Sequence, residues 1–255
     1  MTVSKILDYL WTLAPLSYKE DWDNVGFLLG RGNREVTGVL VALDATKAVA
    51  EEAERLGCQL VVTHHPVIFR GEKHITDADP LTEAHLAFLE KGIAVISMHT
   101  NLDCAPGGVN DVLAERLGLT HVEVLADGET AGLIRMGDTR EWDLPAFAAF
   151  VKERLSCPGL RYVDGGRPVR RVAVGGGACC GFAQRALAAG CDTFITSDLK
   201  YHEFCEAAAM GLNLIDAGHF ETENPVCPVL RDKLAARFPE LRVHLSAHTD
   251  CIQYL

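Results

Sequence analysis

Short apolar runs alternate with amphipathic stretches along most of this 255-residue chain. A first amphipathic helix is predicted over residues 4–13, with Pro15 ending it. Beyond it, strands are predicted at residues 38–43, 60–63 and 93–98, and helices at residues 46–56 and 81–91. Continuous apolar strands between helices are typical of a parallel sheet covered on both faces. The pattern therefore predicts an α/β fold.

The second half of the chain resembles the first. Residues 36–65 match residues 169–198 without gaps at a constant offset of 133, with nine identities in thirty positions. Internal duplication explains this match, and the alternative is that any two β-α-β units look alike at this level. A duplicated chain would form two similar, closely packed α/β domains with mostly parallel sheets.

The domain boundary is expected near residue 125. The predicted domains are residues 1–125, which contain the tandem-histidine motif, and residues 126–255, which contain a second histidine motif. An inserted segment is expected near residues 126–168. The C-terminal strand is open to an alternative, in which it returns to the first domain.

The composition, with 48% hydrophobic and 23% charged residues, is that of an ordinary soluble globular protein. The formal net charge of -11 disfavours nucleic-acid binding, because that mode relies on an excess of Lys and Arg. No apolar run approaches the roughly 20 residues that span a bilayer, so no membrane partner is expected. The nine cysteines contain no CxxC motif and indicate reduced, mostly buried thiols. We expect a cytoplasmic protein.

The strongest local signal is Thr63-His64-His65-Pro66, directly after the predicted strand at residues 60–63. Open α/β sheets bind ligands at the carboxyl ends of their strands. Two adjacent imidazoles there could bind two metal ions, or one ion and an outer partner. The alternative is that His64 is a satisfied polar residue and His65 a surface residue.

The next predicted strand ends in a second polar cluster, His99-Thr100-Asn101-Leu102-Asp103. Asp103 is the first candidate for a metal ligand, since a carboxylate can bridge two cations, and its alternative is a turn-forming role. His99 could bind a metal directly, orient a water molecule or support the site.

A third cluster, with His219 and Glu223, follows the predicted strand at residues 212–215. Asn224-Pro225 is typical of a helix start, which predicts a loop conformation for residues 219–223. Glu221 is the local competitor of Glu223 and is the less favoured ligand.

Together these clusters supply three imidazoles and two carboxylates before His99 is counted. A structural zinc site is closed by four ligands, commonly thiolates, whereas a mixed nitrogen and oxygen set with open positions suits catalytic divalent ions. The sequence therefore indicates a site for two divalent metal ions. Zinc, iron, manganese, cobalt and nickel all suit such ligands.

The chain resembles the NIF-three-like family, whose members are described as dinuclear-metal-centre toroidal hexamers and as homologues of the type 2 class of GTP cyclohydrolase I. The resemblance runs from Asp21-Trp22-Asp23-Asn24 through the three histidine clusters, and includes Ser197-Asp198. It implies His64, His65, Asp103, His219 and Glu223 as the metal ligands, the same five that the chemistry favours. It also implies a homohexameric ring.

The function that we expect is a metal-dependent hydrolase with a small-molecule substrate, for which the resemblance suggests a nucleotide. His99 and His202 are the candidates for proton transfer or substrate orientation. The alternative is a non-catalytic metal-binding or regulatory hexameric scaffold. Gly175-Gly176-Gly177 is a further candidate, either for a phosphate cradle or for a tight turn.

Overall fold

The computed structural model describes residues 1–125 and 132–255, and the chain divides into two compact units. The first unit comprises Met1–Ala105 and Val226–Thr249, and the second comprises Pro106–Pro225 and Asp250–Leu255. This division falls after residue 105 and thus differs from the predicted boundary at residue 125. The physical reason is the packing of helix α5 (Val109–Arg116), whose Leu113 belongs to the core of the second unit.

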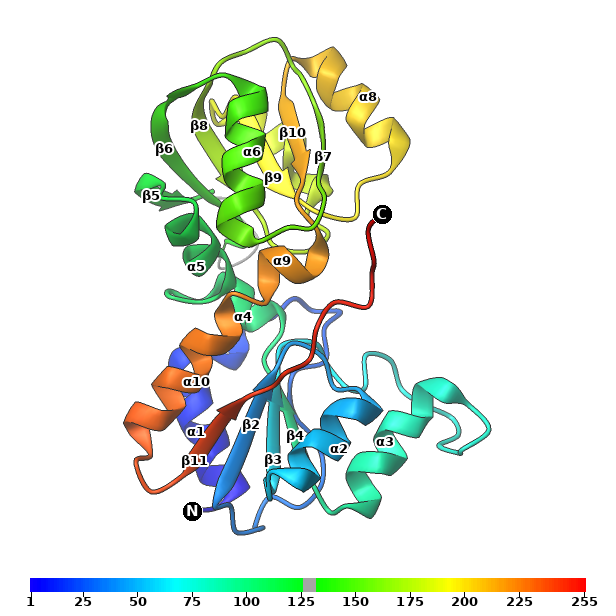
Figure 1. Ribbon diagram of the computed structural model, residues 1–255. Coiled ribbons are helices and arrows are strands. Elements are labelled where there is room, and N and C mark those ends of the chain that lie inside the picture. The colour runs from blue at the N-terminus through cyan, green and yellow to red at the C-terminus, as the bar shows by residue number, and fades with distance from the viewer. Residues whose placement is uncertain (126–131) are drawn as a thin grey trace. The chain divides into compact units, whose positions relative to one another are not determined.

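The first unit contains a five-stranded sheet in the order β1-β4-β3-β2-β11 (Figure 1). The strands are β1 (Gly26–Leu29), β2 (Gly38–Ala42), β3 (Leu60–Thr63), β4 (Ala94–Ser97) and β11 (Arg242–Leu245). Strands β11, β2, β3 and β4 are parallel to one another, and β1 joins β4 in antiparallel orientation. The C-terminal strand thus joins the first sheet, which is the alternative that the sequence left open.

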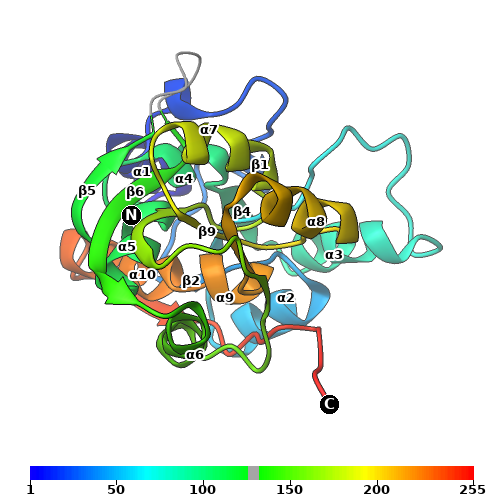
Figure 2. The same cartoon turned by 90° about the horizontal axis from the view of Figure 1, so that it is seen from above.

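Helices cover both faces of this sheet. Helices α2 (Lys47–Arg55) and α3 (Pro80–Glu90) bury Val49 and Phe88 against one face. Helices α1 (Val3–Leu13) and α10 (Val226–Arg237) lie on the opposite face (Figures 1 and 2). The predicted helices at residues 4–13, 46–56 and 81–91 are therefore confirmed, with ends that differ by at most one residue.

The second unit contains a six-stranded sheet in the order β5-β6-β8-β9-β10-β7. The strands are β5 (Thr120–Val124), β6 (Arg135–Trp142), β7 (Arg161–Val163), β8 (Val169–Val174), β9 (Thr193–Thr196) and β10 (Asn213–Asp216). Its central strands β8, β9 and β10 are parallel, whereas β5, β6 and β7 are joined in antiparallel orientation. Residues 126–131 of the predicted insert lie outside the described part of the chain, and its described remainder supplies two of these antiparallel strands.

Helices also cover both faces of the second sheet. Helix α6 (Leu144–Leu155) packs with α5 on one face and buries Phe147 and Val151 against Val172 and Ile195. Helices α7 (Ala183–Ala188) and α8 (Tyr201–Met210) lie on the other face (Figure 2). The predicted α/β class with two sheets is therefore confirmed.

The two sheets share one register at their centres. Val39 pairs with Leu60 in the first sheet, and the residues 133 positions later, Val172 and Thr193, pair in the second. A five-residue helix follows the last of the three matching parallel strands in each unit, α4 (Thr100–Cys104) after β4 and α9 (His219–Glu223) after β10. These agreements favour duplication over a general likeness of β-α-β units.

No helix within the described residues has the length and apolar character needed to cross a bilayer.

Candidate metal centre

The tandem histidines lie at the carboxyl end of β3, as the sequence predicted. The ladder continues past the strand, because the backbone amides of His64 and His65 donate to the carbonyl oxygens of Ala42 and Leu43 at 3.3 and 2.9 Å. His64 is buried and His65 is half-buried. Their ring centroids lie 5.0 Å apart.

Each of these two rings is oriented through its Nδ1 atom. Nδ1 of His64 lies 2.8 Å from the carbonyl oxygen of Met98, and Nδ1 of His65 lies 2.7 Å from Oδ1 of Asp44. Hydrogen bonds with His65 and His248 lower the pKa of Asp44 although burial raises it, so this group is an ionised acceptor. Carbonyl and carboxylate oxygens only accept, so Nδ1 carries the proton in both rings. In the neutral ring Nε2 is therefore the unprotonated nitrogen, which is the form that binds a metal ion.

His99 has the same arrangement. Its Nδ1 lies 2.8 Å from Oδ1 of Asp23, whose other oxygen accepts from the backbone amide of Thr100 at 3.0 Å. Burial raises the pKa of Asp23, but the hydrogen bonds from His99 and Thr100 outweigh it and lower this pKa to about 2. Asp23 is thus a permanent acceptor at neutral pH, which fixes the Nδ1–H tautomer of His99.

These three imidazoles gather in one place in the first unit. His64, His65 and His99 each offer one ring nitrogen, and these nitrogens lie within 4.8 Å of one another. Oδ1 of Asp103, on the buried helix α4, lies 3.6 Å from Nε2 of His64. The structure therefore brings together four of the predicted site residues in this unit.

His219 and Glu223 come together in the second unit. They are the first and last residues of the short helix α9, so the predicted loop conformation for residues 219–223 is wrong. Gly218, with φ of +86°, allows the chain to turn directly from β10 into this helix, which ends at Asn224 before α10 begins. Helical spacing of four residues puts Nε2 of His219 3.0 Å from Oε2 of Glu223.

A carboxylate also orients His219. Nδ1 of His219 lies 2.7 Å from Oδ2 of Asp198, a residue with φ of +58° that lies two positions after the end of β9. Nε2 therefore faces Glu223 with its lone pair, and two such electron-rich atoms at 3.0 Å need a cation or a further proton between them. The donors are chemically suited to a divalent ion.

The glycine loop after β8 makes room for this pair. A Cβ atom at Gly177 would lie 2.2 Å from Oε1 of Glu223 and 3.1 Å from Nε2 of His219. The amides of Gly175, Gly176 and Gly177 donate to protein oxygens, namely those of Ile195, Asn110 and Thr222. The phosphate cradle considered for this loop is therefore wrong, because its amides already have acceptors.

Two other candidates lie apart from these ligand groups. His202 lies exposed in the first turn of α8 and is not a member of the groups of possible metal ligands among the described residues. Glu221 is buried with one oxygen toward Gly218, where a Cβ would lie 2.1 Å from Oε2. Burial raises the pKa of Glu221, as expected for a carboxyl group in a poorly solvated place.

The sequence reasoning missed Asp44 as a support for His65, and it named Gly177 without its role of leaving room for Glu223. Asp44 follows β2 at the carboxyl end of the sheet, so the strand-end rule that singled out the histidines also applied to it. The role of Gly177 depends on the position of Glu223, which no local pattern gives.

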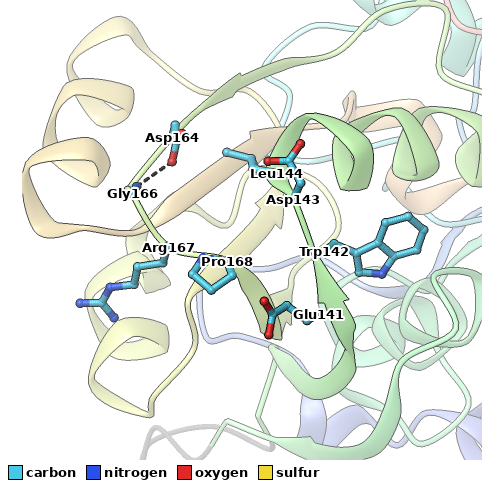
Figure 3. Close-up of a pocket in the computed structure, with 8 residues that line it drawn as sticks. All are labelled: Glu141, Trp142, Asp143, Leu144, Asp164, Gly166, Arg167 and Pro168. Atoms are coloured by element: carbon cyan, nitrogen blue, oxygen red, sulfur yellow. Dashed lines mark hydrogen bonds between the residues drawn. The ribbon is translucent and has the colours of Figure 1, made fainter.

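A cavity of about 570 Å³ lies elsewhere in the second unit (Figure 3). It is lined by the end of β6 and by the loop between β7 and β8, with Trp142, Asp164 and Arg167 among its residues. None of the predicted site residues lines it. The chemistry of the histidines is thus separate from this cavity.

Comparisons with known proteins agree with the motifs. The sequence profile of a family described as Duf34/NIF3 (NGG1p interacting factor 3) matches residues 1–251. The chain is 34% identical over 243 residues to a GTP cyclohydrolase 1 type 2 homolog of Clostridium perfringens, which covers 93% of this chain and 92% of that one. A protein of the same description from Streptomyces coelicolor is 36% identical over 258 residues, covering 96% and 90%.

Solved structures show the same fold. A hypothetical protein of Staphylococcus aureus superposes with a TM-score of 0.93 at 30% identity, covering 100% of this chain and 99% of that one. A Bacillus cereus protein related to NIF3 superposes with the same TM-score at 24% identity, covering 100% and 99%, and supports the fold alone. With the profile match over nearly its full length, the chain belongs to the Duf34/NIF3 family.

Proposed function

We propose that this protein is a divalent-metal-dependent hydrolase whose metal ligands are His64, His65, Asp103, His219 and Glu223. The observation that carries the proposal is the shared orientation of the imidazoles. In His64, His65, His99 and His219 a backbone or carboxylate oxygen accepts from Nδ1, so Nε2 is the unprotonated nitrogen of each neutral ring. Metal-binding histidines commonly have such an outer acceptor.

The number of ions that we propose is two. Five protein donors exceed the four of a closed structural site and leave coordination positions for water and substrate. A divalent ion held by such donors supplies Lewis acidity to an electrophile and makes a nearby water more acidic. Zinc, iron, manganese, cobalt and nickel all remain candidates.

His99 is the residue that we propose for proton transfer. The Asp23 carboxylate accepts from Nδ1 of His99 and holds its ring, as in other Asp-His pairs that act as general bases. His202 is the second candidate and would act on substrate from the start of α8. The alternative is that His99 is itself a metal ligand. The metal content of a His99 variant distinguishes the two roles, because only the loss of a ligand would lower it.

The substrate that we propose is a small molecule, and a nucleotide is the first class to test. The support is the name of the curated relatives, GTP cyclohydrolase 1 type 2 homolog. We further propose a homohexameric ring, as the family resemblance suggests, and a cytoplasmic location.

The experiment is a screen of metal-free protein against nucleotides and phosphoesters, with each divalent ion restored in turn. We expect turnover that depends on the ion, that Glu223→Gln abolishes, and that His99→Gln lowers at unchanged metal content. Bound metal without turnover of any compound would favour the non-catalytic scaffold. Equal turnover with and without metal would contradict the proposal.

A further inference from the structure

Two exposed aromatic side chains lie beside His99 in the first unit. Trp22 is 61% exposed and Phe69 is 46% exposed. Their ring centroids lie 5.8 Å apart, and each lies close to the ring of His99, at 6.1 and 6.2 Å. The centroid of His99 in turn lies 5.2 Å from that of His64. His99 therefore connects the aromatic pair to the imidazole cluster.

Hydrogen bonds hold both segments that carry these rings. Nδ2 of Asn24 donates to the carbonyl oxygen of Ile68 at 2.6 Å, which links the residues next to Trp22 and Phe69. Asp23 is fixed by Thr100 and His99, as described above. The two rings thus belong to loops that are tied together, which reduces the entropy that a ligand would have to remove.

The other two tryptophans are less exposed than Trp22 and are partly buried. Trp142 packs at tilted angles near Phe147 and Phe150, with Arg140 over its ring, and a ring edge of Trp11 packs against Gly26. Trp22 instead leaves most of its surface in water, which forgoes the stabilisation that burial of an indole gives. An anchored aromatic side chain that stays exposed is typical of a binding site.

We infer that Trp22 and Phe69 form a platform for a planar heteroaromatic ring of a small-molecule ligand. This ring stacks on Trp22 and meets the Phe69 ring, tilted by 60° to Trp22, at its edge, and the remaining part of the ligand extends past His99 toward His64 and His65. The inference rests on the proposed function and adds the residues that would recognise the ring. Aromatic side chains bind nucleobase-like rings by stacking, largely independent of which base is present.

The surroundings of the platform favour a small ligand over a protein. Residues 70–73, Arg-Gly-Glu-Lys, are exposed and follow Phe69 directly, and the imidazole of His99 lies beside both aromatic rings. A stable protein interface needs roughly 800 Å² per partner with an apolar centre. Two rings surrounded by polar groups match one planar ring better than such an interface.

The test is calorimetric titration of metal-free protein with guanosine, with ribose as the probe that lacks the ring. We expect guanosine to bind and ribose not to bind. Trp22→Ala should weaken guanosine binding by roughly tenfold or more, since stacking on one side chain contributes on that scale. Phe69→Ala should weaken it as well, and Trp22→Phe should retain most of it. Tyr162→Ala, which removes an exposed aromatic ring from β7, is the matched control and should bind as the unchanged protein does.

Three results would overturn the platform. The first is no guanosine binding by the unchanged protein. The second is guanosine binding by Trp22→Ala and Phe69→Ala that equals binding by the unchanged protein. The third is a change of oligomeric mass in these variants, which would make the surface an interface between copies. Zinc uptake is measured in parallel by elemental analysis. Failed guanosine binding with intact zinc uptake removes the platform alone, whereas failed zinc uptake with intact guanosine binding removes the proposed function alone.

Discussion

The two units build the same three parallel strands but place different polar residues at the strand ends. In the first unit Asp44 follows β2 and supports His65, which follows β3. In the second unit the positions 133 residues later hold Gly177 and Asp198, and Asp198 supports His219 after the next strand. In the second unit the carboxylate-imidazole pair thus lies one strand later along the chain than in the first unit.

This difference separates what the fold needs from what the chemistry needs. The shared register depends on apolar residues such as Val39 and Val172, which are fully buried in both units. The strand-end positions carry little of that packing, so they can change from Asp to Gly or from His to Asp without loss of the sheet. Each unit consequently offers its own set of donors on a common scaffold.

The largest expected effect comes from removing one imidazole in either unit. Zinc that binds the folded chain and not the unfolded one should raise the melting temperature. At a hundredfold excess over the dissociation constant it adds about 2.7 kcal/mol to the free energy of unfolding. His65→Ala and His219→Ala should each remove most of this rise, as measured by thermal unfolding with and without zinc. His74→Ala, in an exposed loop, is the control and should keep the full rise. If only one of the two variants lost the rise, the units would not both contribute ligands.

The next effect concerns the supporting carboxylates. Asp44→Asn and Asp198→Asn keep the size of the side chain but remove the charge that fixes the Nδ1–H tautomer. Loss of such outer partners typically costs tenfold to a hundredfold in metal affinity. We expect similar losses in both variants by competition with a chelating dye, and Asp8→Asn on α1 as an unaffected control. Unchanged affinity in both would mean that the two histidines need no outer acceptor.

A smaller effect is expected at the position where the units differ most, Gly177. Gly177→Ala puts a methyl group where Oε1 of Glu223 lies and strains a residue with φ of +65°. Zinc affinity should fall by roughly tenfold, because overpacking of this kind costs about 1–3 kcal/mol. Gly181→Ala, whose Cβ would meet open space, is the matched control. Equal affinities for the two variants would show that Glu223 can move away without loss.

The smallest effect concerns two buried cysteines that occupy matching positions in the two units. Cys58 and Cys191 occupy equivalent positions, and burial raises the pKa of each thiol to about 11. At pH 8 only about one thiol in a thousand is then ionised at these sites, so both should resist iodoacetamide. The exposed Cys205 and Cys251 should react first, as mass spectrometry of the native protein can measure. Fast labelling of one buried thiol alone would indicate that one unit opens more readily than the other.

The apolar pattern was sufficient to predict the fold class and the strands that carry the site. Continuous runs such as Leu60–Thr63 form buried strands, and strand ends locate polar clusters, so the three histidine motifs could be found from local sequence. The conformation of His219–Glu223 could not, because Asn224-Pro225 is a valid helix start and nothing local shows that Gly218 begins a helix earlier. The domain boundary was missed because α5 follows α4 after only four residues yet packs on the second sheet.

The supporting contacts were harder to foresee than the candidate ligands. Asp44 and His65 are 21 residues apart, and Asp23 and His99 are 76 apart, so their pairing depends on how strands and loops are brought together. Spacing arguments apply within one helix or strand and do not reach across such separations.

The central claim, that these side chains bind divalent metal, is tested most directly by the stoichiometry of bound ion. Metal-free protein is dialysed against zinc, and the ion per chain is measured by elemental analysis. We predict two ions per chain for the unchanged protein and a loss of bound zinc in both Asp103→Asn and Glu223→Gln. Zinc at the level of the buffer in the unchanged protein, or two ions retained by both variants, would contradict the account.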